Sequence, residues 1–280
     1  MSIDSLFELT SSGDFLITAY NLEQTLDRSV TIDEVSEELK LDWGPADEIR
    51  WILSGASYVS LDGDDDEIIE ILPKGRTYAE TLQQKHSFIA RFLTGTIGLS
   101  PYAACENAAM FRHVLTDETI EEMEDYDEEN GFTEMPEENL NFFHCSLKEV
   151  LKSSCLNYLI YLYFADLEQN GKVTVDSLAD FHNMTSPEIM TGKIKILEES
   201  GYVQTGADKV IRITPDGNEK LKDIMSRHDH ITELLKFTLE KEDEEAQKEA
   251  WFCQFLITDE AFHSIDKFLA DNGVTVNTEI

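Results

Sequence analysis

The feature that most constrains the fold is an internal repeat, in which the same landmarks recur 142 positions apart. The stretch LPKGRTYAETLQQKH has a proline, a glycine and, eleven residues after the glycine, a histidine, and TPDGNEKLKDIMSRH has them again. The residues related by this offset are Gly75 and Gly217, His86 and His228, and Thr116 and Thr258. One offset that holds over more than forty residues indicates a duplicated unit rather than chance. We therefore expect two copies of one fold.

Each copy predicts the same order of elements. A first helix is followed by a short second helix and by a third helix. The threonine or the aspartate of Thr-Ile-Asp-Glu, from Thr31, or of Thr-Val-Asp-Ser, from Thr174, can cap the second helix. A short β-hairpin comes next, in YVSLDGDDDEIIEILP and YVQTGADKVIRITP. A long helix then runs through the histidine, and one further helix is expected over about residues 102–125 or 244–270. Three helices and a hairpin make a winged helix-turn-helix, so the expected fold is mainly α with small β-hairpin wings.

These elements divide the chain into six segments. Between the copies, EDYDEENGFTEMPEENLN lacks apolar periodicity and is expected to be an acidic linker. The expected segments are a winged helix-turn-helix at 1–72, a helical domain at 73–125, the linker at 126–146, a second winged helix-turn-helix at 147–216, a second helical domain at 217–272 and a tail at 273–280.

Composition excludes several classes of protein. A chain of 280 residues with 41% hydrophobic residues is long and apolar enough for about two domains with cores of their own. No apolar run approaches the ~20 residues of a membrane span, and the N-terminus lacks the pattern of a secretory signal. The four cysteines form no C-x-x-C pair, which favours reduced, buried thiols. We expect a cytoplasmic protein that does not contact a membrane.

The charge is strongly acidic and unevenly distributed. Fifty-seven acidic residues against 22 basic ones give a net charge of −35. Residues 1–140 hold 32 acids and 8 bases, a net of −24, whereas residues 141–280 hold 25 and 14, a net of −11. Such a field repels polyanions at long range, so general affinity for nucleic acid is not expected.

The first copy resembles a known family. The winged-helix pattern followed by GRTYAETLQQKHSFIARFLTGTIGLSPYAACENAAMFRHVLTDE is similar to the diphtheria-toxin-repressor and manganese-transport-regulator family, from about Asp14 to Met123. The second copy resembles it more weakly, through its winged-helix pattern, SRHDHI and LITDE. The resemblance implies a metal-activated transcriptional repressor that works as a homodimer. It also implies that the two helical domains are dimerisation-like, so that a tandem could fold as a pseudo-dimer within one chain.

The resemblance also implies a site for a divalent transition metal, manganese or iron, in the first copy. The candidate ligands are Asp14, His86 and His113, with Cys105 and His228 as weaker candidates. Three further family positions have lost their ligands and hold Ile17, Ala109 and Arg112, the last a cation that would oppose a dication. In the second copy, Trp251, Gln254 and Phe255 stand where ligands belong. The alternative is that no metal binds and the histidines are packing residues.

The two copies differ in their suitability for DNA. The third helix of the first copy offers Asp47, Glu48 and only one cation, Arg50, and its hairpin tip is acidic, with Asp62, Asp64, Asp65, Asp66 and Glu67. Because phosphate contacts supply most of the affinity, we expect this copy not to bind DNA. The candidate DNA-binding residues all belong to the second copy and are Ser186, Thr191, Lys193, Lys195, Lys209 and Arg212. The alternative is that Lys193 and Lys195 only solvate a helix.

Two functions remain. The first is a diverged transcriptional regulator that contacts DNA through its second winged helix, with its metal response weakened or lost, and self-associates through its helical domains. The second is an acidic interaction protein that does not bind DNA, and instead binds a basic partner or sequesters a related regulator. We do not expect an enzyme, because the sequence lacks a Ser-His-Asp order or a phosphate-cradling glycine loop.

Overall fold

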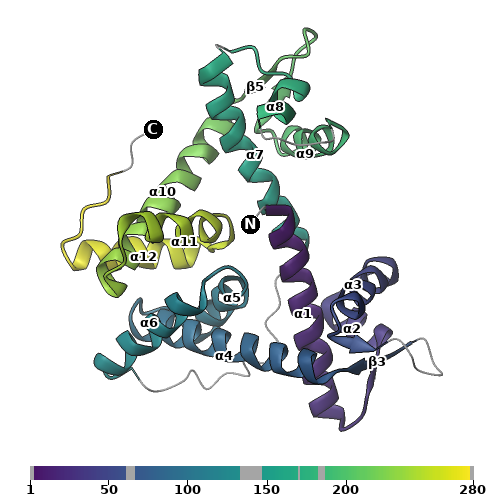
Figure 1. Cartoon of the computed structure of the whole chain (residues 1–280). Coiled ribbons are helices and arrows are strands. Elements are labelled where there is room, and N and C mark those ends of the chain that lie inside the picture. The colour runs from purple at the N-terminus through teal and green to yellow at the C-terminus, as the bar shows by residue number, and fades with distance from the viewer. Residues whose placement is uncertain (1–2, 61–66, 133–146, 170, 182–186, 278–280) are drawn as a thin grey trace.

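The structure is a computed structural model, and it describes residues 3–60, 67–132, 147–169, 171–181 and 187–277. It is mainly helical, with two small antiparallel sheets (Figure 1). This confirms the prediction of a mainly α protein with small β elements. None of the helices within the described residues is long and apolar enough to cross a membrane.

The first unit runs from α1 to α6. Its elements are α1 (Ile3–Leu26), β1 (Val30–Thr31), α2 (Ile32–Leu39), α3 (Trp43–Gly55), β2 (Val59–Ser60), β3 (Ile68–Ile71), α4 (Pro73–Gly95), α5 (Pro101–Phe111) and α6 (Asp117–Glu129). We call α1 to β3 the first head and α4 to α6 the first helical base. In the head, β3 lies between β1 and β2. Thr31 caps α2 in a capping box with Glu34, as the sequence predicts for this helix start.

The second unit repeats this order, without a counterpart of β1 among its described residues. Its elements are α7 (Leu147–Gln169), α8 (Val175–Phe181), α9 (Pro187–Glu199), β4 (Val203–Thr205), β5 (Ile211–Ile213), α10 (Pro215–Leu239), α11 (Asp243–Leu256) and α12 (Asp259–Asp271). We call α7 to β5 the second head and α10 to α12 the second helical base. The tip of its hairpin turns through Lys209, whose φ of 62° is left-handed.

Each helical base holds two helices after its long helix, where the sequence predicted one. The stretch expected as a helix over 102–125 is broken between α5 and α6, and that over 244–270 is broken between α11 and α12. Thr116 and Thr258 begin the new helices, because each side-chain oxygen accepts a hydrogen bond from a backbone N–H in the first turn. Helix α6 continues to Glu129, so residues 126–129 of the expected linker are helical; residues 133–146 lie outside the described chain.

The proline-x-glycine step marks where each head joins its base. A Cβ on Gly75 would lie 2.2 Å from the Tyr58 carbonyl oxygen, and one on Gly217 would lie 2.0 Å from the Tyr202 carbonyl oxygen. Both distances are far below contact, so only glycine lets the start of the long helix pass this close to the hairpin backbone. The glycine of the proline-x-glycine step is therefore required for packing where each head joins its base.

The two helical bases face each other through a pair of equivalent contacts. Asn107 Nδ2 donates to Thr258 Oγ1 at 3.0 Å, and Thr258 N donates to Asn107 Oδ1 at 3.0 Å. In the opposite direction, Thr116 Oγ1 donates to Glu249 Oε1 at 2.6 Å. Asn107 and Glu249 are 142 positions apart, as are Thr116 and Thr258. Each base thus binds the capping threonine of the other, which is the relation that a two-fold axis imposes.

The short helices and hairpins of the two heads lie away from this contact, at two ends of the molecule, whereas α1 and α7 meet between them (Figure 1). The hydrophobic core of the first head includes Phe15, Ile32 and Ile69, and it extends to Ala79 and Leu82 of α4. A second, continuous core joins both helical bases to the second head, from Ile89 to Leu269. Asp14 of α1 lies where the first head meets the residues that follow α5.

Candidate functional site

A buried ion pair fastens the first head to its base. Asp14, on α1, is 1% exposed. Arg112 Nη2 donates to Asp14 Oδ1 at 2.6 Å, and His113 Nε2 lies 2.8 Å from the same oxygen. Arg112 and His113 directly follow α5, and their side chains are also buried. The structure therefore brings together two of the three main candidate ligands, and it adds a buried cation, Arg112, that bonds to Asp14.

The electrostatics of this cluster favour a charged carboxylate. Burial alone would raise the pKa of Asp14, but the charge of Arg112 and the bonds from Arg112 and His113 hold that pKa well below its usual range. Burial lowers the pKa of His113, against the opposing effect of Asp14. At neutral pH the cluster is consequently an Asp–Arg ion pair beside a neutral imidazole.

Gly13 makes room for the His113 ring. A Cβ at this position would lie 2.6 Å from His113 Cε1 and 3.0 Å from His113 Nδ1. Within the described residues, His113 Nδ1 is buried without a hydrogen-bond partner. The ring is thus held against the backbone of α1 in one orientation, in which Nε2 contacts Asp14 and Nδ1 does not.

The two repeated histidines make the same hydrogen bond in both units. His86 Nε2 lies 3.0 Å from the backbone oxygen of Cys105, and His228 Nε2 lies 3.3 Å from the backbone oxygen of Gln247. Cys105 and Gln247 are themselves 142 positions apart. Since a carbonyl only accepts, the histidine donates, and it ties α4 to α5 or α10 to α11.

His86 is buried as well as bonded. Burial and the charge of Arg112 lower its pKa to about 4, despite the opposing bond to Cys105. Together with Arg112 it lines a pocket of about 250 Å³. The weaker candidate Cys105 is fully buried, and it contacts His86 through its backbone oxygen.

These residues do not fit a divalent metal. A transition-metal site needs several donor atoms that converge on one empty position. Asp14 instead has a guanidinium on the oxygen that would bind the ion, and the Nε2 atoms of both histidines are engaged. Across the described residues, no group of three or more His, Cys, Asp or Glu side chains is arranged to hold a metal ion. Arg112, which the sequence marked only as an opposing charge, is the residue that completes the cluster.

The second unit has different chemistry at the equivalent place. The residues 142 positions after Arg112 and His113 are Gln254 and Phe255. Further upstream the offset drifts to 143, as between Thr31 and Thr174, so Asn157 stands near the position of Asp14 and Leu156 precedes it. Leu156, Gln254 and Phe255 line an open pocket of about 330 Å³ instead of a closed ion pair. His228 packs edge-on against Trp251, with ring centroids 6.2 Å apart, and lies beside Asp229. This unit has thus replaced the polar cluster by an aromatic and apolar one.

The candidate DNA-binding residues of the second head lie on α9 and its hairpin. Thr191 and Lys195 of α9 are exposed, and so are Lys209 and Arg212 of the hairpin. Lys193 is half-buried, with its Nζ 5.6 Å from the centre of the Tyr158 ring. Ser186 lies outside the described residues.

Two of these cations are paired with acids. Lys195 Nζ lies 3.8 Å from Glu199, and Arg212 Nη2 lies 2.6 Å from Asp208. Both pairs are well exposed, so each contributes little to stability and can exchange its carboxylate for another anion.

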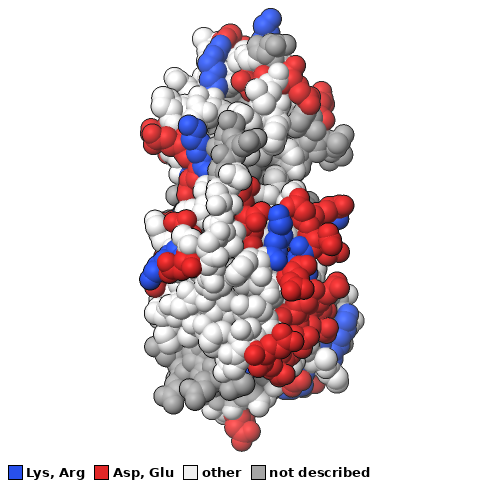
Figure 2. All heavy atoms as spheres, turned by 90° about the vertical axis from the view of Figure 1, so that its left-hand side faces the viewer, with Lys and Arg blue, Asp and Glu red and all other residues white. Residues whose placement is uncertain are grey.

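The corresponding helix of the first head presents an apolar face. Trp43, Trp51 and Ile52 of α3 are 55%, 60% and 45% exposed. Its one cation, Arg50, is buried and donates to Asp47. Glu67 of the hairpin is exposed, whereas Asp62, Asp64, Asp65 and Asp66 lie outside the described residues. On the side of the molecule in Figure 2, acidic side chains gather over one region and basic ones are scattered.

One comparison with known proteins bears on this site. Residues 72–130 match the model of a family described as "Iron dependent repressor, metal binding and dimerisation domain". The match spans α4, α5 and α6, and so includes His86, Arg112 and His113 but not Asp14. No curated protein matches the chain. The first helical base is therefore similar to a regulatory, non-enzymatic domain of the iron-dependent repressors, in agreement with the prediction that the chain is not an enzyme.

Proposed function

We propose that the protein is a transcriptional regulator related to the iron-dependent repressors, in which Arg112 has taken the place of the activating metal. The ion pair between Arg112 and Asp14 carries this proposal. In the resembled family a metal joins the first helix to the helical domain. Here the buried pair joins α1 to the end of α5, and it is present without any ion from solution.

The proposal also holds that one chain does the work of a family dimer. The reciprocal contacts of Asn107 with Thr258 and of Glu249 with Thr116 support it, because they relate the two helical bases as an isologous interface relates two subunits. They also support an origin of the two units by duplication. If two such chains self-associate, each chain contributes two heads that its own helical bases already join.

DNA contact is assigned to the second head. A winged helix-turn-helix places its third helix in the major groove, and its cations neutralise phosphates. Lys195 on α9 and Lys209 and Arg212 on the hairpin are exposed, and the acids beside Lys195 and Arg212 can be displaced by phosphate. The first head, with Trp51 and Ile52 on its equivalent face, is assigned no DNA contact.

Binding of a short random-sequence DNA duplex at low salt, followed by fluorescence anisotropy, tests this function. Lys195→Glu/Lys209→Glu should weaken binding at least ~10-fold, because each reversal replaces attraction to phosphate by repulsion. Lys248→Glu/Lys267→Glu is the matched control, since it changes the net charge equally on exposed positions of α11 and α12. Wild-type affinity should be the same in a chelator and in Mn²⁺. Equal weakening by both double variants would contradict the assignment.

A second function is favoured by the exposed face of α3. The outward half of this helix carries three large apolar side chains, two glycines and Glu48. It has no exposed cation. Apolar patches of this kind mark protein contacts, and the surrounding negative charge favours a basic, amphipathic partner. Under this proposal the first head binds protein, either beside the DNA function or in its place.

The protein-binding function predicts a measurable peptide affinity. A fluorescent, lysine- and leucine-rich amphipathic peptide should bind the wild type, and Trp51→Ser/Ile52→Ser should weaken binding at least ~10-fold. Tyr102→Ser, at a similarly exposed aromatic residue of α5, is the control. If the peptide binds all three proteins equally, the attraction is only the general negative charge and the α3 face is not the site.

A further inference from the structure

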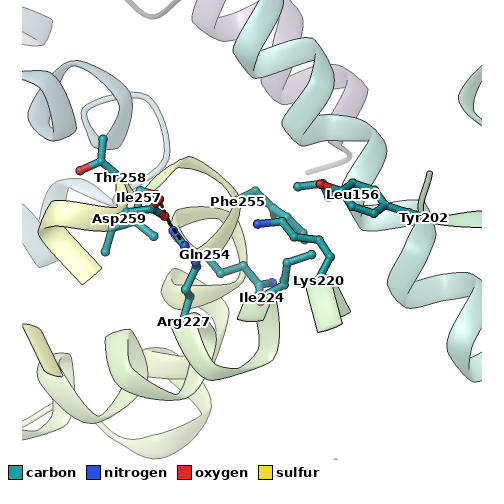
Figure 3. A pocket seen from close by; sticks show the side chains of 10 residues that line it. All are labelled: Leu156, Tyr202, Lys220, Ile224, Arg227, Gln254, Phe255, Ile257, Thr258 and Asp259. Atoms are coloured by element: carbon teal, nitrogen blue, oxygen red, sulfur yellow. Dashed lines mark hydrogen bonds and ion pairs between the residues drawn. The ribbon is translucent and has the colours of Figure 1, made fainter. Parts of the chain in front are cut away.

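The pocket of the second unit occupies the place that the ion pair fills in the first. It lies between the second head and the second helical base and has a volume of about 330 Å³, within the range of small-molecule sites (Figure 3). Leu156 from α7 and Tyr202 face side chains of α10 and α11 across it. A ligand here would therefore contact both the second head and the second helical base. In the first unit, Asp14 and Arg112 join the corresponding two parts.

One part of the pocket is apolar. Leu156, Ile224 and Phe255 come from three different helices, α7, α10 and α11, and all three line the space. They are nearly buried, so they offer little surface to water outside the pocket. Transfer of an apolar group of a ligand onto them is favourable because it removes apolar surface from water.

The other part holds two cations that one carboxylate keeps in position. Lys220 Nζ donates to Asp223 Oδ2 at 2.6 Å, and Arg227 Nε donates to Asp223 Oδ1 at 2.9 Å. Arg227 Nη1 donates to the Ile257 carbonyl at 2.9 Å, and Nη2 donates to Asp259. An ammonium has three N–H donors and a guanidinium five, so these bonds leave donors on both side chains for a ligand.

The charges around this wall are balanced, in a chain of net charge −35. Lys220, Arg227 and Asp259 line the pocket, and Asp223 bonds to both cations without lining it. The Asp259 side chain is 80% exposed, so its own charge is largely solvated. The pocket surface itself therefore presents two cations and one solvated acid, and the remaining N–H donors of the cations favour an anionic group over a cationic one.

We propose that this pocket binds a small apolar carboxylate, such as a short fatty acid or an aryl-acetic acid. Lys220 and Arg227 hold the carboxylate, and Leu156, Ile224 and Phe255 enclose the apolar body. Since Leu156 belongs to the head and the other residues to the base, the bound ligand adds a contact between the second head and its base to the hydrophobic core that already joins them.

Calorimetric titration of the full-length protein with octanoate and phenylacetate tests the proposal without DNA, so its outcome is independent of the DNA-binding function. We expect saturable binding of at least one of them, at one site per chain. The matching neutral amides, octanamide and phenylacetamide, should bind at least ~10-fold more weakly, because they lack the charge that Lys220 and Arg227 recognise. Absence of saturable heat with both carboxylates at millimolar concentration, or equal affinity for the amides, would overturn the proposal.

Variants of two lysines on α10 locate the site. Lys220→Gln should weaken binding at least ~5-fold and Lys220→Glu further, since the second also repels the ligand. Lys222→Gln and Lys222→Glu make the same changes two residues away, at an exposed lysine that does not line the pocket, and should leave the affinity unchanged. Both lysines are accessible to solvent, so the circular dichroism spectra of all four variants should match the wild type. An equal effect of the Lys220 and Lys222 changes would place any binding elsewhere and contradict the proposal.

Discussion

Arg112 and Asp14, 98 positions apart in sequence, form a buried ion pair with a distance of 2.6 Å between Nη2 and Oδ1. The pair joins α1 to the residues that follow α5, and both side chains are 2% exposed. A guanidinium remains charged across the physiological pH range and cannot be removed by a chelator. The first head is therefore fixed by a cation that the chain itself supplies. A divalent ion would have to displace this cation to bind Asp14.

Two glycine substitutions should change stability in opposite directions. Gly13→Ala forces the His113 ring out of the cluster, and we expect it to lower the free energy of unfolding by about 1–3 kcal/mol, although alanine favours the helix. Gly192→Ala is the control, because a Cβ there has no atom within 4 Å, and it should be neutral or stabilise by up to about 1 kcal/mol. Urea unfolding gives both values. Stabilisation by both substitutions would show that His113 does not need the space over Gly13.

Removal of Glu249 should weaken the contact between the helical bases. Its carboxylate accepts hydrogen bonds from Thr116 Oγ1 at 2.6 Å and Thr119 Oγ1 at 2.9 Å, across the interface. Glu249→Ala leaves these buried donors without an acceptor, so the free energy of unfolding should fall by about 2–3 kcal/mol. Glu245→Ala, at an exposed position of the same helix, should change it by less than about 0.5 kcal/mol. Similar values for the two variants in urea unfolding would mean that the bases do not pair as described.

Acid should destabilise the fold through His86. Its pKa is about 4 in the folded protein, below the ordinary histidine value of 6.5, so the folded state binds the proton less readily than the unfolded state. The stabilisation is present above pH 6.5 and is lost as the pH falls from 6.5 to 4, by up to about 3 kcal/mol. His86→Gln keeps a donor for the Cys105 carbonyl and should flatten the dependence of unfolding free energy on pH in this range. His263→Gln, an exposed control on α12, should retain the wild-type slope.

The features that the sequence predicted are those set by local patterns. The 142-residue offset indicated two units with the same order of helices and hairpin strands, and the structure has that order in both. The capping of α2 by Thr31 depends on residues only three positions apart, so it could be predicted. The proline-x-glycine landmark was recognised as part of the repeat, but the close approach of Gly75 to the Tyr58 carbonyl needed coordinates.

The features that the sequence did not predict depend on contacts between distant residues. The position of Arg112 was interpreted as a lost ligand position, and nothing in the sequence shows that its side chain turns to Asp14. Likewise, periodicity cannot show that His86 donates to a backbone carbonyl nineteen residues away. Every residue type has the same backbone carbonyl, so the sequence does not mark the one that accepts. The breaks before α6 and α12 were missed although Thr116 and Thr258 can cap a helix, because the apolar pattern continues across them.

The most direct test of the central claim is a titration of the protein with Co²⁺, followed by calorimetry and by the visible absorption of the bound ion. The account predicts no saturable binding at this site in the wild type, because Arg112 occupies Asp14. Arg112→Glu replaces the cation by a carboxylate beside Asp14 and His113, so this variant should be less stable alone and should gain one Co²⁺ site, with a rise in Tm. The further change His113→Ala should abolish that gain. Saturable binding of one Co²⁺ by the wild type that disappears in Asp14→Asn would contradict the account.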